Sequence, residues 1–283
     1  MKSARQSSCS EVSATANLHT DMSGLEIKLA ISGTGISRIV IGNSQNRGRR
    51  EYQEDSFGFS SLAKADVAKN GFAAIVADGM GGLTDSRQIS TFAVQSVIAA
   101  VPALGAEKSV PLRLKALAAE MNRNACAMQT GGGSTLAMAY CRHDGVYWCS
   151  VGDSRIYLFR AGKLWQVTED ADYLTDLLDE VLRGEITYDE AAEDKRKTAL
   201  THYIGDSGEV YAETNVTPFL PLDGDKLLIC SDGVYNALEE DELAAILRDN
   251  PQAAADRIIS EVLKKGYENQ DNFTSVILGF SEN

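Results

Sequence analysis

Nine short apolar runs recur between residues 38 and 280, and their lengths are those of β-strands. They are RIVIG, SFGFS, FAAIVA, STLAMAYC, VYWCSV, RIYLFR, KLWQV, KLLICS and FTSVILGF. The dipeptides Asp144-Gly145 and Ala161-Gly162 separate two pairs of runs so closely that they predict tight hairpins. Strands joined by such hairpins are antiparallel neighbours in one sheet.

Four other segments carry apolar residues at the three- and four-residue spacing of amphipathic helices: residues 86–101, 112–128, 239–247 and 251–265. Asn250 can cap the last of these helices, Pro251 can occupy its first turn and Gly266 can end it. Hairpin-linked strands are grouped apart from the helices. We therefore predict an α+β fold, a β-sandwich of two antiparallel sheets flanked by helices in four αββα layers.

The first 35 residues are rich in Ser, Thr and Ala and show no such pattern, so we expect residues 1–35 to form a disordered tail. Residues 36–283 then form a single domain. The tail has no continuous apolar stretch of the kind that a secretion signal or a membrane span requires.

Composition narrows the classes of function. The chain has 283 residues, 44% of them hydrophobic, which is ample for a large core. Its formal net charge of −13 disfavours binding to nucleic acid or to an anionic membrane, and favours a cation or a positively charged partner. Its five cysteines form no CxxC pair and mostly lie in apolar runs, which indicates reduced core thiols and a cytoplasmic location.

Acidic residues lie at the ends of several predicted strands. They are Asp78, Asp153, Asp232, Asp271 and the pair Glu54 and Asp55. An isolated acid beside Gly is usually a turn residue, but these acids converge if the strand ends converge. Two carboxylates about 4 Å apart repel by roughly 4 kcal/mol at an effective dielectric near 20, so a cluster needs cations. Oxygen ligands suit Mg²⁺ or Mn²⁺, and no His or Cys cluster is present to favour zinc.

Six blocks of sequence, in order, resemble the metal-dependent PPM (type 2C) protein serine/threonine phosphatases. They are RREYQED, ADGMGG, GGGSTLAMAY, VGDSRIYLFRAGKL, LLICSDGVYNAL and QDNFTSVIL. The resemblance covers about residues 38–280, and DGMGG is common in bacterial members. It implies one catalytic domain over residues 36–283 with a flap at about residues 170–204. It also implies hydrolysis of phosphoserine and phosphothreonine on proteins by a metal-activated water at a dinuclear Mg²⁺ or Mn²⁺ site.

The resemblance also assigns roles to residues. Asp78 matches the acid that bridges the two metal ions, Glu54 acts through water, and Asp153 with Asp232 can hold a third, weaker ion. Arg50 matches the arginine that binds phosphate, and its planar guanidinium suits two phosphate oxygens. The expected catalytic residues are Arg50, Asp55 and Asp78, and the expected metal ligands are Glu54, Asp55, Asp78, the Gly79 carbonyl, Asp153, Asp232 and Asp271.

The sequence departs from the family pattern in two places. Met80 stands where many eukaryotic members have a histidine that acts as a general acid. TEDADYL, residues 168–174, replaces the usual D-H-S, which leaves the local contacts there open. In the flap, apolar spacing from residue 174 to residue 182 predicts a helix, and Thr187 with Glu190 predicts a capping box for a second one. Whether the flap selects substrates stays open.

Other classes of enzyme and site fit the sequence less well. No cysteine has the C-x₅-R spacing of a cysteine phosphatase, and three histidines make a Ser/His/Asp triad improbable. Asp153 could merely cap a hairpin. Residues 131–133 read as a lead into the next strand, because no Lys-Ser or Lys-Thr follows them to complete a phosphate loop.

The preferred function is a hydrolase that acts on phosphorylated proteins, opposes a serine/threonine kinase in signalling, and is a monomer. A non-catalytic, phosphoprotein-binding regulatory relative of the same fold is the second candidate. A plain cation-binding or scaffolding protein is the third, and the presence of Arg50 speaks against it.

Overall fold

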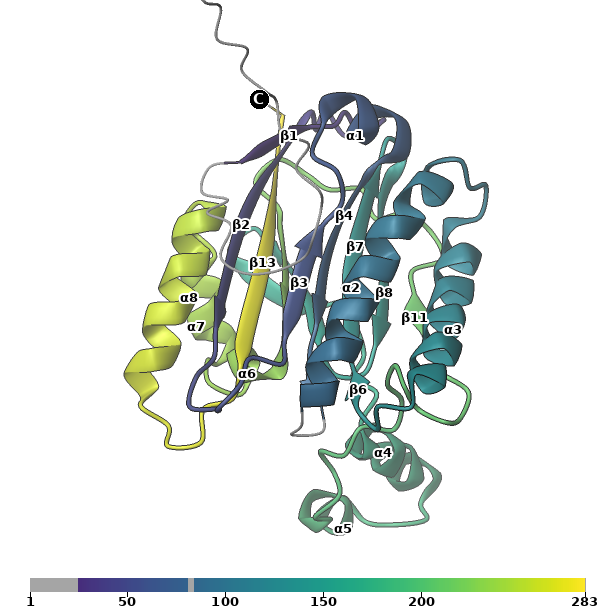
Figure 1. The fold of residues 1–283 in the computed structure, drawn as a ribbon. Helices are drawn as coiled ribbons and strands as arrows, with labels where there is room; N and C mark the ends of the chain where they lie inside the picture. The colour runs from purple at the N-terminus through teal and green to yellow at the C-terminus, as the bar shows by residue number, and fades with distance from the viewer. Residues whose placement is uncertain (1–24, 81–83, 283) are drawn as a thin grey trace, which may run out of the picture.

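The computed structural model describes residues 25–80 and 84–282. Two antiparallel sheets face each other, with helices on the outer face of each (Figure 1). One sheet has the order β1 (Glu26–Lys28), β2 (Arg38–Asn46), β13 (Phe273–Ser281), β12 (Lys226–Cys230), β9 (Arg155–Arg160) and β10 (Lys163–Gln166). The other has the order β11 (Glu213–Thr214), β8 (Gly145–Val151), β7 (Leu136–Arg142), β4 (Phe72–Ala77) and β3 (Ser56–Phe59). The predicted αββα sandwich is confirmed.

The remaining elements cover the sheets or join them. A small pair of strands consists of β5 (Gly79–Met80) and β6 (Gly133–Ser134). The helices are α1 (Lys64–Asn70), α2 (Thr84–Gly105), α3 (Val110–Met128), α4 (Tyr173–Arg183), α5 (Tyr188–Glu193), α6 (Asp232–Tyr235), α7 (Glu240–Ile246) and α8 (Pro251–Lys265). In Figure 1, α2 and α3 lie over the five-stranded sheet, and α7 and α8 lie over the six-stranded one.

Strand β4 is apolar at every position, and β12 at every position after its first, because both faces of these strands are buried. In β4, Ile75 packs against α2 and α3, while its neighbour Val76 packs between the two sheets. In β12, Leu227 lies between the sheets and Leu228 packs against α7 and α8. Removing a side chain of this size from water stabilises the fold by about 1.5–3 kcal/mol. These layers hold the strand ends in fixed positions.

The predicted elements agree closely with the structure. All nine apolar runs form strands, and both predicted hairpins join antiparallel neighbours. Helix α8 has the predicted bounds: the Asn250 side chain accepts a hydrogen bond from the Ala253 N–H (2.9 Å), and Gly266 ends the helix at a φ of 66°. The pattern missed β1, β5, β6, β11, α1 and α6, which have between two and seven residues each. Residues 131–133 lead into β6 and β7, as expected.

The folded part begins earlier than the predicted residue 36. Residues 1–24 of the expected tail lie outside the described residues, but β1 pairs with β2. Ile27, Leu29 and Ile31 are buried in the core between the sheets. Their spacing of two residues is that of a strand with one buried face, and it was the signal that could have located β1.

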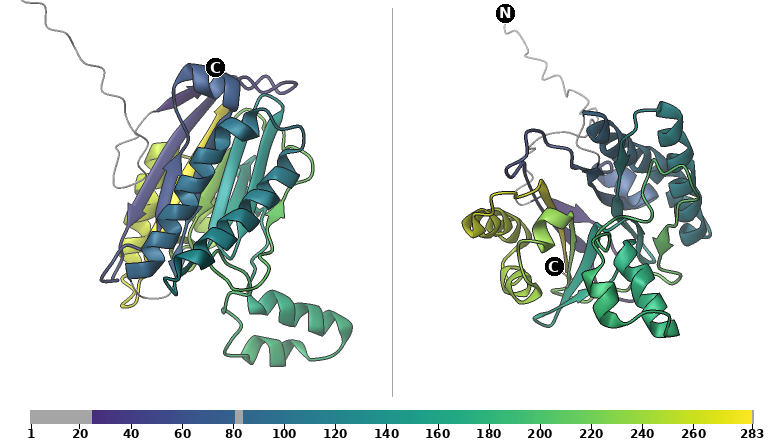
Figure 2. Two further views of the ribbon diagram at one scale, coloured as in Figure 1. Left: turned by 45° about the vertical axis from the view of Figure 1, so that its right-hand side comes forward. Right: turned by 90° about the horizontal axis from the view of Figure 1, so that it is seen from below.

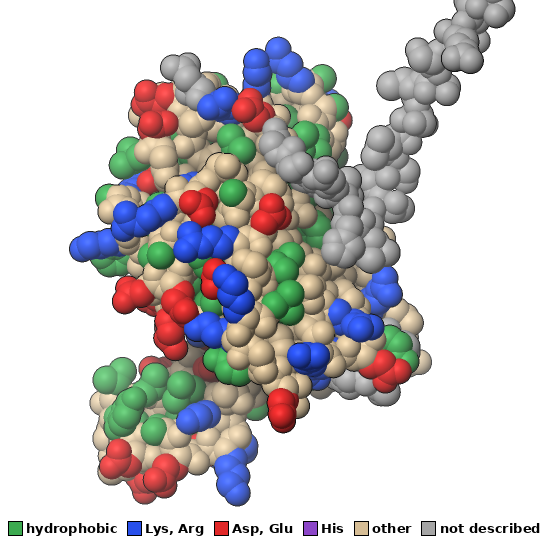
Figure 3. Space-filling view, turned by 90° about the vertical axis from the view of Figure 1, so that its left-hand side faces the viewer, with side chains coloured by type: hydrophobic (Ala, Val, Ile, Leu, Met, Phe, Trp, Pro, Cys, Tyr) green, Lys and Arg blue, Asp and Glu red, His purple; other side chains and the backbone are tan. Residues whose placement is uncertain are grey.

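A segment beside the sandwich forms the flap, defined here as residues 172–200. It contains α4 and α5, which project from one end of the sandwich in Figure 1 and in the left view of Figure 2. Asp172 caps α4, and the predicted capping box between Thr187 and Glu190 is present at the start of α5. Leu177 is buried, whereas Leu182 is 85% exposed. Figure 3 shows hydrophobic side chains gathered on the flap, which stands apart from the body of the molecule.

Two further observations bear on the expected location. Ser86–Gly105 of α2 is long and apolar enough to cross a membrane by length and composition, but here it packs as a core helix against β3 and β4. Cys141, Cys149 and Cys230 are buried free thiols, and Cys126 is an exposed one. Cys9 lies outside the described residues.

Candidate metal centre

The predicted site residues come together in a cavity of about 260 Å³ at the end of the sandwich from which the flap projects. Its lining contains every one of them except Asp55, which lies fully buried at the same strand ends. Thr198 and Leu200 of the flap complete one wall, so the flap lies beside the site as expected. The lining residues are Arg50, Glu54, Asp78, Gly79, Met80, Thr135, Asp153, Thr198, Leu200, Asp232 and Asp271.

Asp55 is fixed by both sheets. It directly precedes β3 and is 3% exposed. Its Oδ2 accepts hydrogen bonds from Ser231 Oγ (2.8 Å) and Thr274 Oγ1 (2.7 Å), which lie at the end of β12 and in β13. Its Oδ1 is buried and has no hydrogen-bond partner. One carboxylate oxygen is therefore held by the protein, and the other is left without a partner.

Asp78 and Gly79 follow β4. The Asp78 N–H donates to Thr135 Oγ1 (2.9 Å), and the Thr135 N–H donates back to the Asp78 carbonyl (2.8 Å). Gly79 has a packing role in addition to its expected role as a ligand. A Cβ at this position would lie 2.6 Å from the Glu54 carbonyl oxygen and 2.9 Å from that of Ser86, so a side chain cannot fit.

Asp232 and Asp271 enter from the six-stranded sheet. Asp232 begins α6, and its Oδ2 accepts a hydrogen bond from Asn236 Nδ2 (3.2 Å), while its Oδ1 is buried without a partner. Asp271 lies two residues before β13, and its carboxylate pairs with the Arg50 guanidinium. Arg50 is half exposed at the rim of the cavity, where its other N–H groups are open to a ligand.

Glu54 and Asp153 complete the acidic set. The Glu54 N–H donates to Asn272 Oδ1 (2.7 Å), and its carbonyl accepts from Ser90 Oγ (2.6 Å). Hydrogen bonds therefore hold the Glu54 backbone at both its N–H and its carbonyl. Asp153 lies in the bend between β8 and β9, and its carbonyl accepts a hydrogen bond from the Tyr235 hydroxyl (3.0 Å). Asp153 is also part of the cavity lining.

The cluster is electrostatically unfavourable without cations. Burial raises the pKa of Asp78 well above its usual value, and the charges of Asp55, Asp232 and Asp153 raise it further. Burial also raises the pKa of Asp55 to about 6, although its bonds from Thr274 and Ser231 oppose this. The pKa of Asp232 is raised to about 6 by burial and then by Asp271 and Asp55. Burial and then the charge of Asp232 raise that of Asp153 to about 7.

This donor set fits hard divalent cations. The two unpartnered oxygens, Asp55 Oδ1 and Asp232 Oδ1, are buried carboxylate oxygens, and a buried polar atom without a partner calls for a ligand. Within residues 25–80 and 84–282, no three carboxylate, imidazole or thiolate side chains are arranged to enclose one ion by themselves. Mg²⁺ is typically held by one or two carboxylates with water in its other positions, so an open set of this kind suits it.

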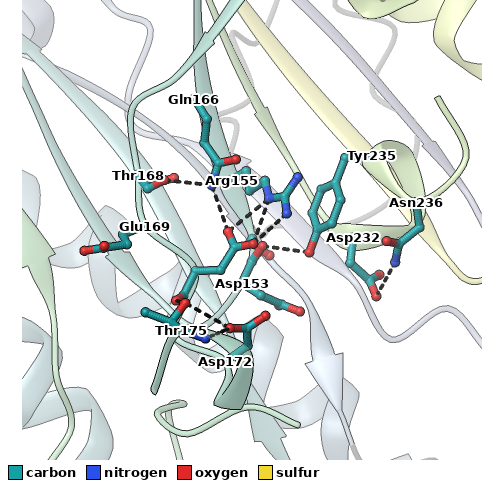
Figure 4. Close-up of polar contacts among 12 residues, drawn as sticks. Asp153, Arg155, Gln166, Thr168, Glu169, Asp172, Thr175, Asp232, Tyr235 and Asn236 are labelled. Atoms are coloured by element: carbon teal, nitrogen blue, oxygen red, sulfur yellow. Dashed lines mark hydrogen bonds and ion pairs between the residues drawn. The ribbon is translucent and has the colours of Figure 1, made fainter. Parts of the chain in front are cut away.

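Sequence reasoning missed a set of residues that surrounds Asp153. The Arg155 guanidinium makes a bidentate ion pair with Asp170 (2.6 Å between Nη2 and Oδ2) and lies over the Tyr235 ring, 3.6 Å from its centroid (Figure 4). Asp170 belongs to TEDADYL, whose contacts the sequence left open. The available signal was that Arg155 follows Asp153 by two residues, at the start of a strand. Nothing in the neighbouring sequence identifies the partners of Arg155.

Comparisons with known proteins are consistent with this geometry. The sequence model of the family "Protein phosphatase 2C" matches residues 43–268. A Listeria innocua protein named serine/threonine phosphatase stp is 31% identical over 244 residues, which cover 82% of this chain and 92% of the relative. The Streptococcus agalactiae serine/threonine phosphatase structure is similar in fold, with a TM-score of 0.73 at 24% identity over 85% of this chain and 99% of that one.

A third comparison bears on the metal. The catalytic domain of the phosphatase PstP, solved in complex with two manganese ions, has a TM-score of 0.62 to this structure. The identity is 26%, and the match covers 86% of this chain and 98% of that one.

Proposed function

Because the chain belongs to the protein phosphatase 2C family, we propose that it hydrolyses phosphoserine and phosphothreonine on proteins, using two bound Mg²⁺ or Mn²⁺ ions. The observation that carries this proposal is the meeting of distant acids in one cavity, with two of their buried oxygens unpartnered. The name of the Listeria relative supports the substrate class, and the two manganese ions of the PstP domain support the metal.

The chain supplies ligands from both sheets. Asp55, Asp78, Asp232 and Asp271 would hold the two ions with the Gly79 carbonyl, and Asp78 would bridge them. Glu54 would act through water, and Asp153 with Asp232 would hold a third, weaker ion. When bound, such ions lower the pKa of an attacking water and neutralise charge on the phosphoryl oxygens.

Arg50 would orient the phosphate. Its guanidinium already lies at the mouth of the cavity, positioned by its pair with Asp271, and its planar fork can donate to two phosphate oxygens at once. Met80 lines the cavity where a histidine would supply a proton, and a thioether has none to give. The leaving oxygen of serine or threonine therefore takes its proton from water.

The cellular setting follows from the same proposal. A phosphatase of this kind acts on phosphorylated proteins and opposes a serine/threonine kinase. The buried free thiols at Cys141, Cys149 and Cys230 support a reducing, cytoplasmic location. We propose that the chain acts as a monomer, since all the acids of the site come from one chain.

Turnover of a small aryl phosphate with Mn²⁺ tests the proposal, comparing the parent chain with Asp232→Ala. The parent should turn over the substrate only with added Mn²⁺, and Asp232→Ala should lose this activity. Asp241→Ala removes an exposed acid of α7 that does not line the cavity, and serves as the matched control that retains activity. If the parent binds Mn²⁺ but does not turn over the substrate, the second candidate function replaces the phosphatase as the preferred one.

That second candidate is a non-catalytic relative that binds phosphoprotein. It predicts that the parent binds a phosphoserine peptide without releasing phosphate, and that the loss of Arg50 weakens this binding. The retention of every expected ligand, Asp55, Asp78, Asp232 and Asp271 included, favours the enzyme.

A further inference from the structure

The flap is attached to the loop that carries Asp153 by backbone hydrogen bonds. The Ala171 N–H donates to the Gly152 carbonyl (3.0 Å), and the Thr201 N–H donates to the Ala171 carbonyl (2.9 Å). Ala171 directly precedes the flap, Thr201 directly follows it, and Gly152 is the neighbour of Asp153. Both ends of the flap are therefore joined, through Ala171, to the loop that carries Asp153. A change in the conformation of the flap base is therefore passed to this loop by hydrogen bonds, without a rearrangement of the hydrophobic core.

A polar side-chain link runs parallel to this backbone connection. Asp170, two residues before the flap, accepts from Arg155 Nε (3.0 Å) and Nη2 (2.6 Å). The Asp170 carbonyl also accepts from Thr175 Oγ1 in α4 (2.9 Å), and its carboxylate accepts from Gln166 Nε2 (3.0 Å). The Arg155–Asp170 pair is largely buried, at 22% and 15% exposure of the two side chains, so water weakens it little.

Tyr235 joins this link to the acidic cluster. Its ring lies against the Arg155 guanidinium, and its hydroxyl donates to the Asp153 carbonyl (3.0 Å), as Figure 4 shows. Tyr235 is also the last residue of α6, the short helix that begins with Asp232. One side chain thus contacts Asp153 directly and shares a helical turn with Asp232, the two acids that would hold the third ion.

We propose that Tyr235, Arg155 and Asp170 form a positioning relay through which the flap sets the orientation of Asp153, and with it the affinity of the cation site that uses this acid. This inference rests on the proposed function. None of the three residues needs to touch the ion or the substrate. The Tyr235 hydroxyl fixes the backbone at Asp153, Arg155 fixes the Tyr235 ring, and Asp170 ties Arg155 to the base of α4. Partners of this outer kind typically change metal affinity 10- to 100-fold.

The chain contains a matched control for this relay. Arg155 Nη1 also donates to the hydroxyl of Tyr157 (2.8 Å), a fully buried residue of β9. Tyr157→Phe and Tyr235→Phe each delete one hydroxyl beside the same guanidinium. Only Tyr235→Phe removes the bond to Asp153. Arg155→Lys keeps the charge but loses the bidentate, stacked geometry.

The experiment measures Mn²⁺ binding to the full-length parent, to these three variants and to Asp153→Asn, by titration calorimetry. Hydrogen exchange of residues 172–200 is followed with and without Mn²⁺. The weak class of sites is defined as the one that Asp153→Asn abolishes. If the flap raises the affinity of these weak sites for Mn²⁺, thermodynamic linkage requires that Mn²⁺ bound there stabilises the flap and slows its hydrogen exchange. We expect Tyr235→Phe and Arg155→Lys to weaken the class by about tenfold and to remove the Mn²⁺-dependent protection, with Tyr157→Phe like the parent.

Three outcomes would overturn the relay. Tyr235→Phe could bind Mn²⁺ like the parent, all three variants could weaken it equally, or Mn²⁺ could leave flap exchange unchanged in the parent. Each is distinguishable from failure of the proposed function. A parent that turns over aryl phosphate with Mn²⁺ keeps the phosphatase assignment even if the relay fails, whereas a parent without turnover removes the assignment first.

Discussion

The sandwich and the flap are held in place by different forces. Ile75 and Leu228 lie in layers that are buried on both sides, and they belong to cores that contain many other apolar residues. In the flap, Leu177 is buried, but Leu178, Leu182 and Tyr188 are exposed at 37%, 85% and 66%. The sandwich therefore has the packing energy to hold repelling acids together, whereas the flap depends on hydrogen bonds at its base and on its helix caps.

The acids of the two regions show the same contrast. Burial and like charges raise the pKa of Asp55 to about 6 at the strand ends. In the flap, hydrogen bonds from Arg196 lower the pKa of Asp194 to about 2. Flap acids stabilise their own structure, while the site acids cost the sandwich stability until a cation binds. Regions that carry function are often built at such a cost.

The largest expected effect is on activity. Asp78→Asn should lower Mn²⁺-dependent turnover of a small aryl phosphate on the order of 10³-fold or more, because it removes the proposed bridging ligand. It should not lower the melting temperature of the metal-free protein, since one repelling charge is gone. Leu182→Ser in the exposed part of the flap is the control, and its turnover should stay within about twofold of the parent. A large loss in the control would mean that the flap surface is part of the site for small substrates.

The next prediction applies one substitution to two buried leucines. Leu228→Ala in β12 should lower the free energy of unfolding by about 2–5 kcal/mol, since it leaves a cavity in a fully packed layer. Leu177→Ala in α4 should change global unfolding by less than about 1 kcal/mol, because the flap can open locally while the sandwich stays folded. Urea titrations measure the global values, and hydrogen exchange of residues 173–183 should reveal the local loss. Equal global losses would show that flap and sandwich unfold as one unit.

Stability should depend on pH in the metal-free protein. The folded-state pKa of Asp55 and Asp232 is raised to about 6 and that of Asp153 to about 7, from an unfolded value of 3.8. Between these values the folded state binds more protons than the unfolded state, so the free energy of unfolding falls as pH rises from about 4 to about 7. We expect a loss on the order of 5 kcal/mol between pH 5 and pH 8 in EDTA.

Mn²⁺ supplies the check on that prediction. Saturating Mn²⁺ should remove most of the loss, since the ion compensates the charges that the proton otherwise neutralises. Stability that rises from pH 5 to pH 8 in EDTA would contradict the assignment of the cluster as the dominant source of strain. Asp78→Asn should show a smaller dependence on pH than the parent, because the variant lacks an acid whose own pKa is raised well above its usual value in the folded state.

The sequence was sufficient to predict what depends on local pattern. Continuous apolar runs identify strands buried on both faces, and an acid at the end of each run identifies the edge where the site forms, as at Asp78 and Asp232. Caps such as Asn250 set the helix bounds. Two-residue strands such as β5 and β6 offer too few positions for a period, whereas the alternation of Ile27, Leu29 and Ile31 does indicate that the folded part begins before residue 36.

The contacts that hold the site could not be predicted, because they join distant parts of the chain. Asp55 is held by Ser231 and Thr274, which lie 176 and 219 residues away. The Tyr235 hydroxyl reaches Asp153 across 82 residues. Serine, threonine and tyrosine are common in strands and helices alike, so their types carry no sign of these partners. The family resemblance predicts metal ligands, and the tertiary structure identifies what orients the predicted side chains.

The smallest expected effect compares two helix caps. The Asn250 side chain accepts from the Ala253 N–H at the start of α8, and Thr187 makes the equivalent bond to the Glu190 N–H at the start of α5. Replacing either by Ala should cost its helix about 1 kcal/mol. Because α8 packs on β2 and β13, Asn250→Ala should lower global stability by that amount.

Thr187→Ala, in contrast, should raise hydrogen exchange in residues 188–193 and leave the urea midpoint within about 0.3 kcal/mol of the parent, since α5 can fray without unfolding the sandwich. The two variants therefore measure how far the flap is coupled to the rest of the molecule. If both shift the midpoint equally, the flap is part of the cooperative unit, and its attachment involves more than the hydrogen bonds at its base. If only Asn250→Ala does so, those hydrogen bonds are the route by which flap and site can influence each other.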